Sequence, residues 1–155
     1  MVATFLKIPA RDFVLEIDSA YGSSGSPNFI PIEGLTNLTL KANTNRADTT
    51  DFDSEGIAEH LLMERGQEFT VAGHYLEDPL TGERPDGQVA FETFATKVGT
   101  EAYVAFQLTS PGGNKRAFIG TIESPGALGG GHNDPSGWGG TITVSGPVTY
   151  TPAGS

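Results

Sequence analysis

Four acidic residues fall within eight positions of the sequence, in the segment DTTDFDSE. These are Asp48, Asp51, Asp53 and Glu55. Carboxylates this close together suggest a cation site, an acid–base pair or a surface that docks on another protein. The spacing from Asp51 onward matches the start of an EF-hand calcium loop, but the twelfth position, which needs a bidentate Glu, is Leu62. The sequence therefore does not predict a calcium site.

Other catalytic patterns are also missing from the sequence. Acids along one loop lack the rigid cleft and the contrasting environments that a catalytic carboxylate pair needs. His60, His74 and His132 are isolated, and no G-x-S-x-G occurs. The Gly-rich stretch 124–139 lacks the G-K-[ST] ending of a phosphate-binding loop. We therefore predict no catalytic residue, no metal site and no cofactor, and do not expect an enzyme.

Composition narrows the class of protein further. The 155 residues carry a formal net charge of −10 with nine basic residues, which argues against a nucleic-acid binder. The chain has no cysteine, so disulfides are excluded. No signal peptide and no apolar run of about 20 residues is present, so we expect one domain that is made in a cytoplasm and has no membrane partner. Only 18% of the residues are charged, which favours a surface that is buried against copies of itself.

Clusters of Gly and Pro divide the chain into short runs that are rich in β-branched and aromatic residues. These runs predict strands at 13–17, 35–42, 68–75, 102–109, 116–123 and 140–151. In the third run, Phe69 and Val71 alternate with Glu68 and Thr70, which indicates one apolar face and one polar face. The polar face is either solvated or lines a lumen or an interface. Residues 55–68 fit either one or two helical turns or a distorted strand, and we favour a return strand with a turn at Arg65–Gly66.

One segment has helical spacing instead. Asp86 stands at an N-cap position, and Phe91, Phe94 and Val98 form one apolar stripe that ends before Gly99. We expect a helix at 86–98 that packs this stripe on a sheet. The Gly-rich loop 124–139 should be a connection anchored by Trp138, packed at the start of the last strand. The order of elements predicts a mainly β (α+β) barrel or sandwich with one flanking helix.

The motif DTTDFDSEG (48–56), the strand that ends in Gly73–His74–Tyr75 and the following helix resemble the major tail tube protein of long-tailed, siphovirus-like bacteriophages. The resemblance covers about residues 30–150. It departs from the family at Ile57, where a Trp is usual. It implies two packed antiparallel β-sheets with a flanking helix, in a subunit whose hexameric rings stack into a hollow tube for DNA ejection.

The resemblance also implies how the chain is divided and where copies meet. A tube domain at 13–150 lies between an N-terminal arm, 1–12, and a C-terminal tail, 151–155. The long stacking loop is 43–58, and Glu68 and Thr70 are expected to face the lumen. The residues expected to contact the next ring are Arg46, Asp48, Thr49, Asp51, Phe52, Asp53 and Glu55.

Expected partners follow from the same resemblance. They are further copies of the chain and the tape measure, tail tip and terminator proteins of a virion tail, while genomic DNA passes through without specific binding. One alternative is the tube protein of a contractile tail, a tailocin or a related injection system. A second alternative is a non-catalytic β-sandwich module for binding or decoration, for which one Trp and four Tyr supply few exposed aromatic candidates.

Overall fold

The computed structural model describes residues 4–9, 12–23, 25–48, 60–123 and 128–154, with the backbone alone for 43–48 and 60–65. Its elements follow in the order β1 (Val14–Asp18), β2 (Phe29–Pro31), β3 (Leu35–Asp48), β4 (His60–His74), α1 (Asp86–Ala95), a 3₁₀ turn η3 (Gly99–Ala102), β5 (Val104–Thr109), β6 (Lys115–Glu123) and β7 (Gly137–Thr151). The expectation of a mainly β chain with one α-helix is confirmed for the described residues.

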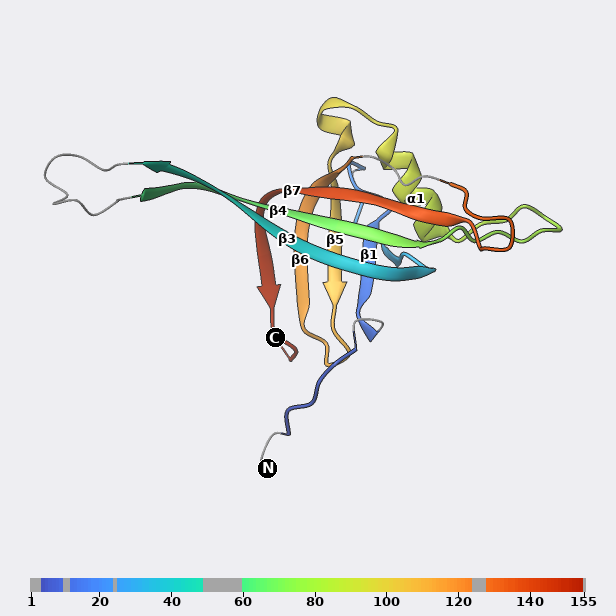
Figure 1. Cartoon of the computed structure of the whole chain (residues 1–155), viewed down its shortest axis with the longest axis horizontal. Coiled ribbons are helices and arrows are strands. Elements are labelled where there is room, and N and C mark those ends of the chain that lie inside the picture. Colours follow the sequence, from blue (N-terminus) through green and yellow to red (C-terminus); the bar gives the residue numbers. More distant parts are fainter. Residues whose placement is uncertain (1–3, 10–11, 24, 49–59, 124–127, 155) are drawn as a thin grey trace, which may run out of the picture.

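All of these strands belong to one antiparallel sheet, in the order β2-β1-β5-β6-β7-β4-β3. Two sheets were expected, but β7 joins both halves, since its first part pairs with β4 and its residues from Thr141 to Thr151 pair with β6. Figure 1 shows β3, β4 and the first half of β7 crossing β1, β5 and β6 before β7 turns to run beside β6. Gly146, at φ +84°, lies where the β6–β7 register shifts and permits this bend.

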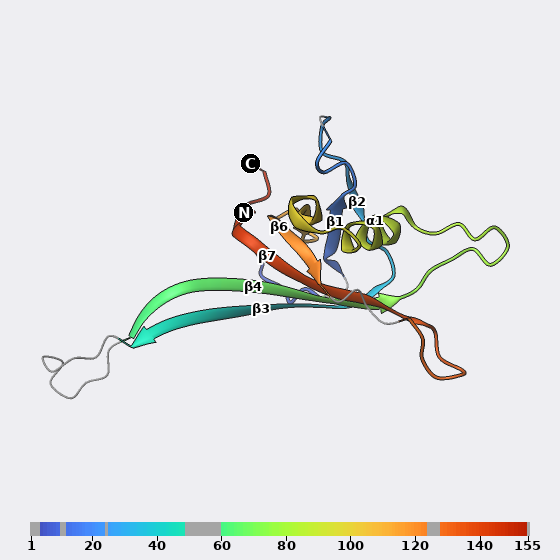
Figure 2. The same cartoon turned by 90° about the horizontal axis from the view of Figure 1, so that it is seen from above.

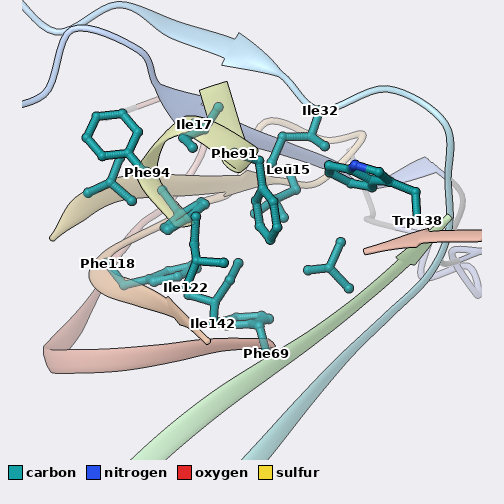
Figure 3. Packing of buried hydrophobic residues seen from close by; sticks show 13 residues of the cluster. Leu15, Ile17, Ile32, Phe69, Phe91, Phe94, Phe118, Ile122, Trp138 and Ile142 are labelled. Carbon is teal, nitrogen blue, oxygen red and sulfur yellow. The ribbon is translucent and has the colours of Figure 1, made fainter. Parts of the chain in front are cut away.

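The core lies between the two halves of the bent sheet and α1 (Figure 3). Phe69 of β4 stacks on Phe118 of β6 with ring centroids 4.6 Å apart, which joins the halves directly. Phe91 of α1 meets the Trp138 ring at 5.0 Å and the Phe106 ring at 6.5 Å. Aromatic pairs at these separations add to the stabilisation from buried area, so α1 is part of the core.

The helix ends earlier than the sequence pattern suggested. Phe91 and Phe94 are buried, but α1 stops at Ala95 and Val98 is 84% exposed, so its assignment to the apolar stripe is wrong. The amide of Lys97 bonds the carbonyl of Phe94 three residues back, which tightens the last turn and turns the chain away. The N-cap residue is Pro85 and not Asp86, which lies in the first turn.

β3 and β4 form a long hairpin, paired from Leu35 and Gly73 to Asp48 and His60. The return strand was expected, but the turn at Arg65–Gly66 is wrong, because Arg65 pairs with Thr44 and Gly66 with Asn43. Residues 43–48, expected to begin a loop, are strand. The residues before and after Gly66 are paired with β3, which satisfies their backbone groups, so the chain does not turn at this glycine. The hairpin reaches beyond the rest of the fold along its longest axis (Figures 1 and 2).

Candidate assembly surface

The hairpin leads into the acidic segment and out of residues 49–59. β3 ends at Asp48 and β4 begins at His60. Arg46 and Asp48 lie in β3, and their side chains are outside the described part of the structure. The other expected contact residues, Thr49, Asp51, Phe52, Asp53 and Glu55, lie outside the described residues altogether. The long hairpin therefore fixes only where the chain enters and leaves residues 49–59, and the docking role of the acids stays a prediction.

Two rows of polar residues cross the outer face of β3, β4 and β7. In strand order they are Lys41–Glu68–Thr143 and Thr39–Thr70–Thr141. Phe69, which lies between Glu68 and Thr70 in sequence, is 1% exposed in the core, so the alternation along β4 turns Glu68 and Thr70 away from the core. We name these six residues the polar face. Within these six residues the one acid, Glu68, lies opposite the one base, Lys41, and the second row continues onto β6 with Glu123, which pairs with Thr141.

A polar cluster fixes the end of β4 relative to α1. The two terminal nitrogens of Arg84 donate to the carboxylate of Glu92, with Nη2 3.1 Å from Oε1. The same Oε1 accepts a hydrogen bond of 2.9 Å from Trp138 Nε1. Trp138 is 4% exposed, which confirms the expectation that it packs at the start of the last strand. The cluster therefore ties the loop after β4 to α1 and β7.

Gln88 of α1 completes this cluster from inside the protein. Its side chain is fully buried, and its Nε2 donates to the carbonyls of Glu33 at 3.0 Å and His74 at 2.8 Å. Its Oε1 accepts from the amide of Leu76 and from Arg84 Nη2, both at 3.3 Å. A buried amide with all of its groups paired holds one geometry. Sequence reasoning missed this cluster, because its members lie up to 54 positions apart and form no local pattern.

The pKa of Glu92 is lowered, first by the hydrogen bond from Arg84 and then by that from Trp138. A depressed carboxylate pKa contributes stability above the unfolded-state value, and this contribution is lost as the pH falls through the folded-state pKa. We expect Glu92→Gln to cost about 1–2 kcal/mol at pH 7, less than a fully buried charged hydrogen bond because the Glu92 side chain is 36% exposed.

The measurement for Glu92→Gln is the free energy of unfolding in urea as a function of pH. The difference from the unmodified chain should close as the pH falls below the folded-state pKa, because Glu92 is then protonated as well. Glu101→Gln, at an exposed residue, serves as the control and should stay within about 0.5 kcal/mol at neutral pH. A Glu92→Gln penalty that does not change with pH would contradict the assigned charge interaction.

In the described part of the chain, no three His, Cys, Asp or Glu residues are grouped so that they could hold a metal ion. Within the same residues, no helix has the length and apolar character needed to cross a membrane.

Comparison with known proteins gives matches in structure alone. No family model and no curated protein sequence matches the chain. One matching structure is the tail of an empty gene transfer agent (GTA) particle, refined as a helix with C6 symmetry. It has a TM-score of 0.67 and 20% identity, and the match covers 94% of this chain and 100% of that chain.

Two other assemblies contain similar chains. The virion of a native GTA particle gives a TM-score of 0.66 at 20% identity, again over 94% of this chain and 100% of that chain. The six-fold symmetrised baseplate of the anti-feeding prophage (AFP) gives 0.50 at 11% identity, over 100% of both chains. The fold is thus shared from end to end. The resemblance to the tail tube proteins of bacteriophages is confirmed at the level of the fold, which this chain has in common with proteins of a GTA tail, a GTA virion and a prophage baseplate.

Proposed function

We propose that the protein is a structural subunit of a phage-like tail tube, in which hexameric rings of identical copies stack into a conduit for DNA. The observation that carries this proposal is the match of nearly the whole chain to a tail refined with C6 symmetry. The long β3–β4 hairpin supports it, because it projects past the body and holds Asp48 and His60, which flank residues 49–59, at its far end. In this proposal the acids of the segment 43–58 contact the next ring.

We further propose that the polar face lines the channel. Four of its six residues are threonines, and Lys41 lies opposite Glu68. Binding of DNA depends on rows of basic residues that displace counterions from the phosphates, and this face offers one lysine with an acid beside it. A wall of this kind lets DNA slide. Six chains would carry a formal charge of about −60, so other acids must meet basic residues or be screened.

Size-exclusion chromatography followed by negative-stain electron microscopy of the concentrated protein tests the proposed function. We expect rings of six subunits and stacks of such rings. A protein that stays monomeric at every concentration and salt condition would contradict the proposal and favour the β-sandwich decoration module. Turnover of a small molecule would also contradict it.

The AFP baseplate match favours a second candidate. It shows that the fold occurs outside GTA tails, so the chain is alternatively the tube protein of a contractile tail, a tailocin or a related injection system. Both candidates predict rings and tubes. Micrographs of the native particle distinguish them, because a contractile device has a sheath around the tube.

The docking role of the acidic segment has a direct test. We expect Asp51→Ala with Asp53→Ala to lower tube yield at least tenfold at the concentration where the unmodified chain is half assembled. Each surface contact contributes about 0.2–1 kcal/mol, the variant removes two per loop, and six loops act together in a ring. A change of about 1.4 kcal/mol already alters an equilibrium tenfold.

The matched control for this double variant is Glu101→Ala with Glu83→Ala, since neither residue lies on the polar face. Both glutamates are exposed and lie outside the acidic segment, and their replacement removes the same two negative charges. This control should assemble as well as the unmodified chain. Equal loss in both variants would assign the effect to net charge, and unchanged tubes from the Asp variant would contradict the docking role.

A further inference from the structure

A hollow lies between the outer surface of α1 and the chain that joins β1 to β2. Its volume is about 390 Å³, and sites for small molecules commonly enclose roughly 300–1,000 Å³. Its lining includes Tyr21, Asn28, Asp86, Val89, Thr93 and Lys97. None of these residues belongs to the polar face or to the acidic segment, so the proposed assembly leaves the hollow without a role. We call it the helix-side hollow.

Both walls of the helix-side hollow are held in place by the fold. The lining positions of α1 are three or four residues apart and share one face, while Phe91 on another face is fixed in the core. On the other wall, Asp18 is 3% exposed, and its Oδ1 accepts hydrogen bonds from the amides of Ala20 at 3.0 Å and Asn28 at 2.9 Å. The hollow is therefore preformed, which lowers the entropic cost of binding.

The lining combines apolar surface with polar groups that the described part of the fold does not use. Within the described residues, no hydrogen bond engages the Tyr21 hydroxyl or the Asp86 carboxylate. Val89, which is 42% exposed, places an apolar side chain among these groups. A ligand that fits such a lining has an apolar face and several hydroxyl groups around it. Pyranose rings have this character, since their C–H groups form apolar patches and their hydroxyls lie at the edge.

The charges of the lining favour an uncharged ligand. Asp86 lies in the first turn of α1 and Lys97 follows the end of the helix, so a rise of 1.5 Å per residue separates them by roughly 15 Å. A small zwitterion cannot reach both groups. Nζ of Lys97 also lies 4.4 Å from the centre of the Phe94 ring, in a cation–π contact. All other residues of the lining are uncharged.

We propose that the helix-side hollow binds an uncharged pyranose sugar. The Asp86 carboxylate accepts hydrogen bonds from sugar hydroxyls, the Tyr21 hydroxyl bonds a further one, and Val89 contacts the C–H face of the ring. Binding needs one chain only, so this inference goes beyond the proposed self-assembly. Figure 2 shows α1 and β2 on one side of the body and β3 on the other. In a tube whose channel is lined by the polar face, the hollow therefore lies on the outside, where external sugars reach it.

Saturation-transfer difference NMR tests this site, because it detects weak binding in the ligand signals and works for single chains, rings and tubes alike. The probes are glucose, galactose, mannose and N-acetylglucosamine, with glycerol as a polyol that has no ring. We expect a saturable signal from at least one sugar, with a Kd of about 0.1–10 mM. This signal should exceed that of glycerol at least about fivefold at equal concentration.

Two variants with matched controls locate the binding site. Val89→Trp fills the hollow and should lower the sugar signal at least about tenfold. Its control is Val98→Trp, at a residue that is 84% exposed and outside the hollow. Asp86→Ala removes the main acceptor and should raise Kd about fivefold or more, whereas Glu101→Ala removes an exposed carboxylate elsewhere and should leave Kd unchanged. Circular dichroism checks that each variant is folded.

The outcomes separate this inference from the proposed function. No signal above glycerol from any of the four sugars would overturn the site, as would an equal effect of Val89→Trp and Val98→Trp. Electron microscopy of the same samples shows whether they assemble. Tubes that bind no sugar would overturn the site and leave the tube intact. Sugar binding by a chain that never forms rings would support the site and contradict the tube.

Discussion

Replacing Gly139 with alanine is expected to destabilise the fold by more than about 3 kcal/mol. A Cβ at this position would lie 2.1 Å from the carbonyl oxygen of Val71 and 2.9 Å from Cα of Ala72, both in the backbone of β4. The backbone of Gly139, at φ +153°, is also unfavourable for an L side chain, at a cost of roughly 1–3 kcal/mol. β4 cannot move away without breaking its pairing with β7, so relieving the clash would itself cost stability.

Thermal unfolding followed by circular dichroism measures this effect. For a chain of this size a loss of 3 kcal/mol lowers Tm by about 6–12 °C. Gly112→Ala is the matched control, because a Cβ there meets no atom within 4 Å, and it should change stability by less than about 0.5 kcal/mol or raise it slightly. Equal Tm values for the two variants would contradict the close approach of β7 to β4.

Replacing Phe91 with alanine should have a comparable or larger effect. Phe91 is fully buried and contacts Phe106 and Trp138, so its removal leaves a cavity between α1 and the sheet. Truncation of a buried Phe costs about 3–5 kcal/mol, against a total stability of about 5–15 kcal/mol for an ordinary domain. We therefore expect a large fall in the urea midpoint and a lower yield of folded protein.

Val89→Ala is the control on the same helix. Val89 is 42% exposed, and alanine has the higher helix propensity, so this change should cost less than about 1 kcal/mol. A Phe91→Ala loss as small as that of Val89→Ala would show that α1 does not belong to the core. Tube assembly of both variants is then measured below their unfolding temperatures, so that a loss of assembly can be distinguished from a loss of folded protein.

The sequence predicted well those elements whose signal is local. Alternation of Phe69 and Val71 with polar residues placed β4 and its two faces, and the spacing of Phe91 and Phe94 placed α1. The resemblance added the overall architecture, which the structural matches share. The end of the helix was predicted too late, because the apolar spacing continues to Val98 although the helix itself ends at Ala95.

Features that depend on distant parts of the chain were missed. The Gly-rich start of β7 has the composition of a loop, yet Gly139 is needed where β7 approaches β4 closely. β2 is three residues long and ends in a proline, too short for a periodic signal. The Arg84–Glu92–Trp138 cluster joins positions that only the folded chain brings together. For the acidic segment the sequence supplies a motif, and the docking assay will decide its role.

Because β7 joins both halves of the sheet, we expect its pairing to limit how quickly a new chain folds. β4 and β7 are separated by more than 60 residues, so their pairing requires closure of a long loop. Contacts of such separation are typical of folding on the millisecond-to-second scale. Before β7 arrives, β4 and β6 each present an unpaired strand edge that can associate wrongly. We therefore expect the rate of β7 pairing to determine how long a newly made chain remains prone to aggregation.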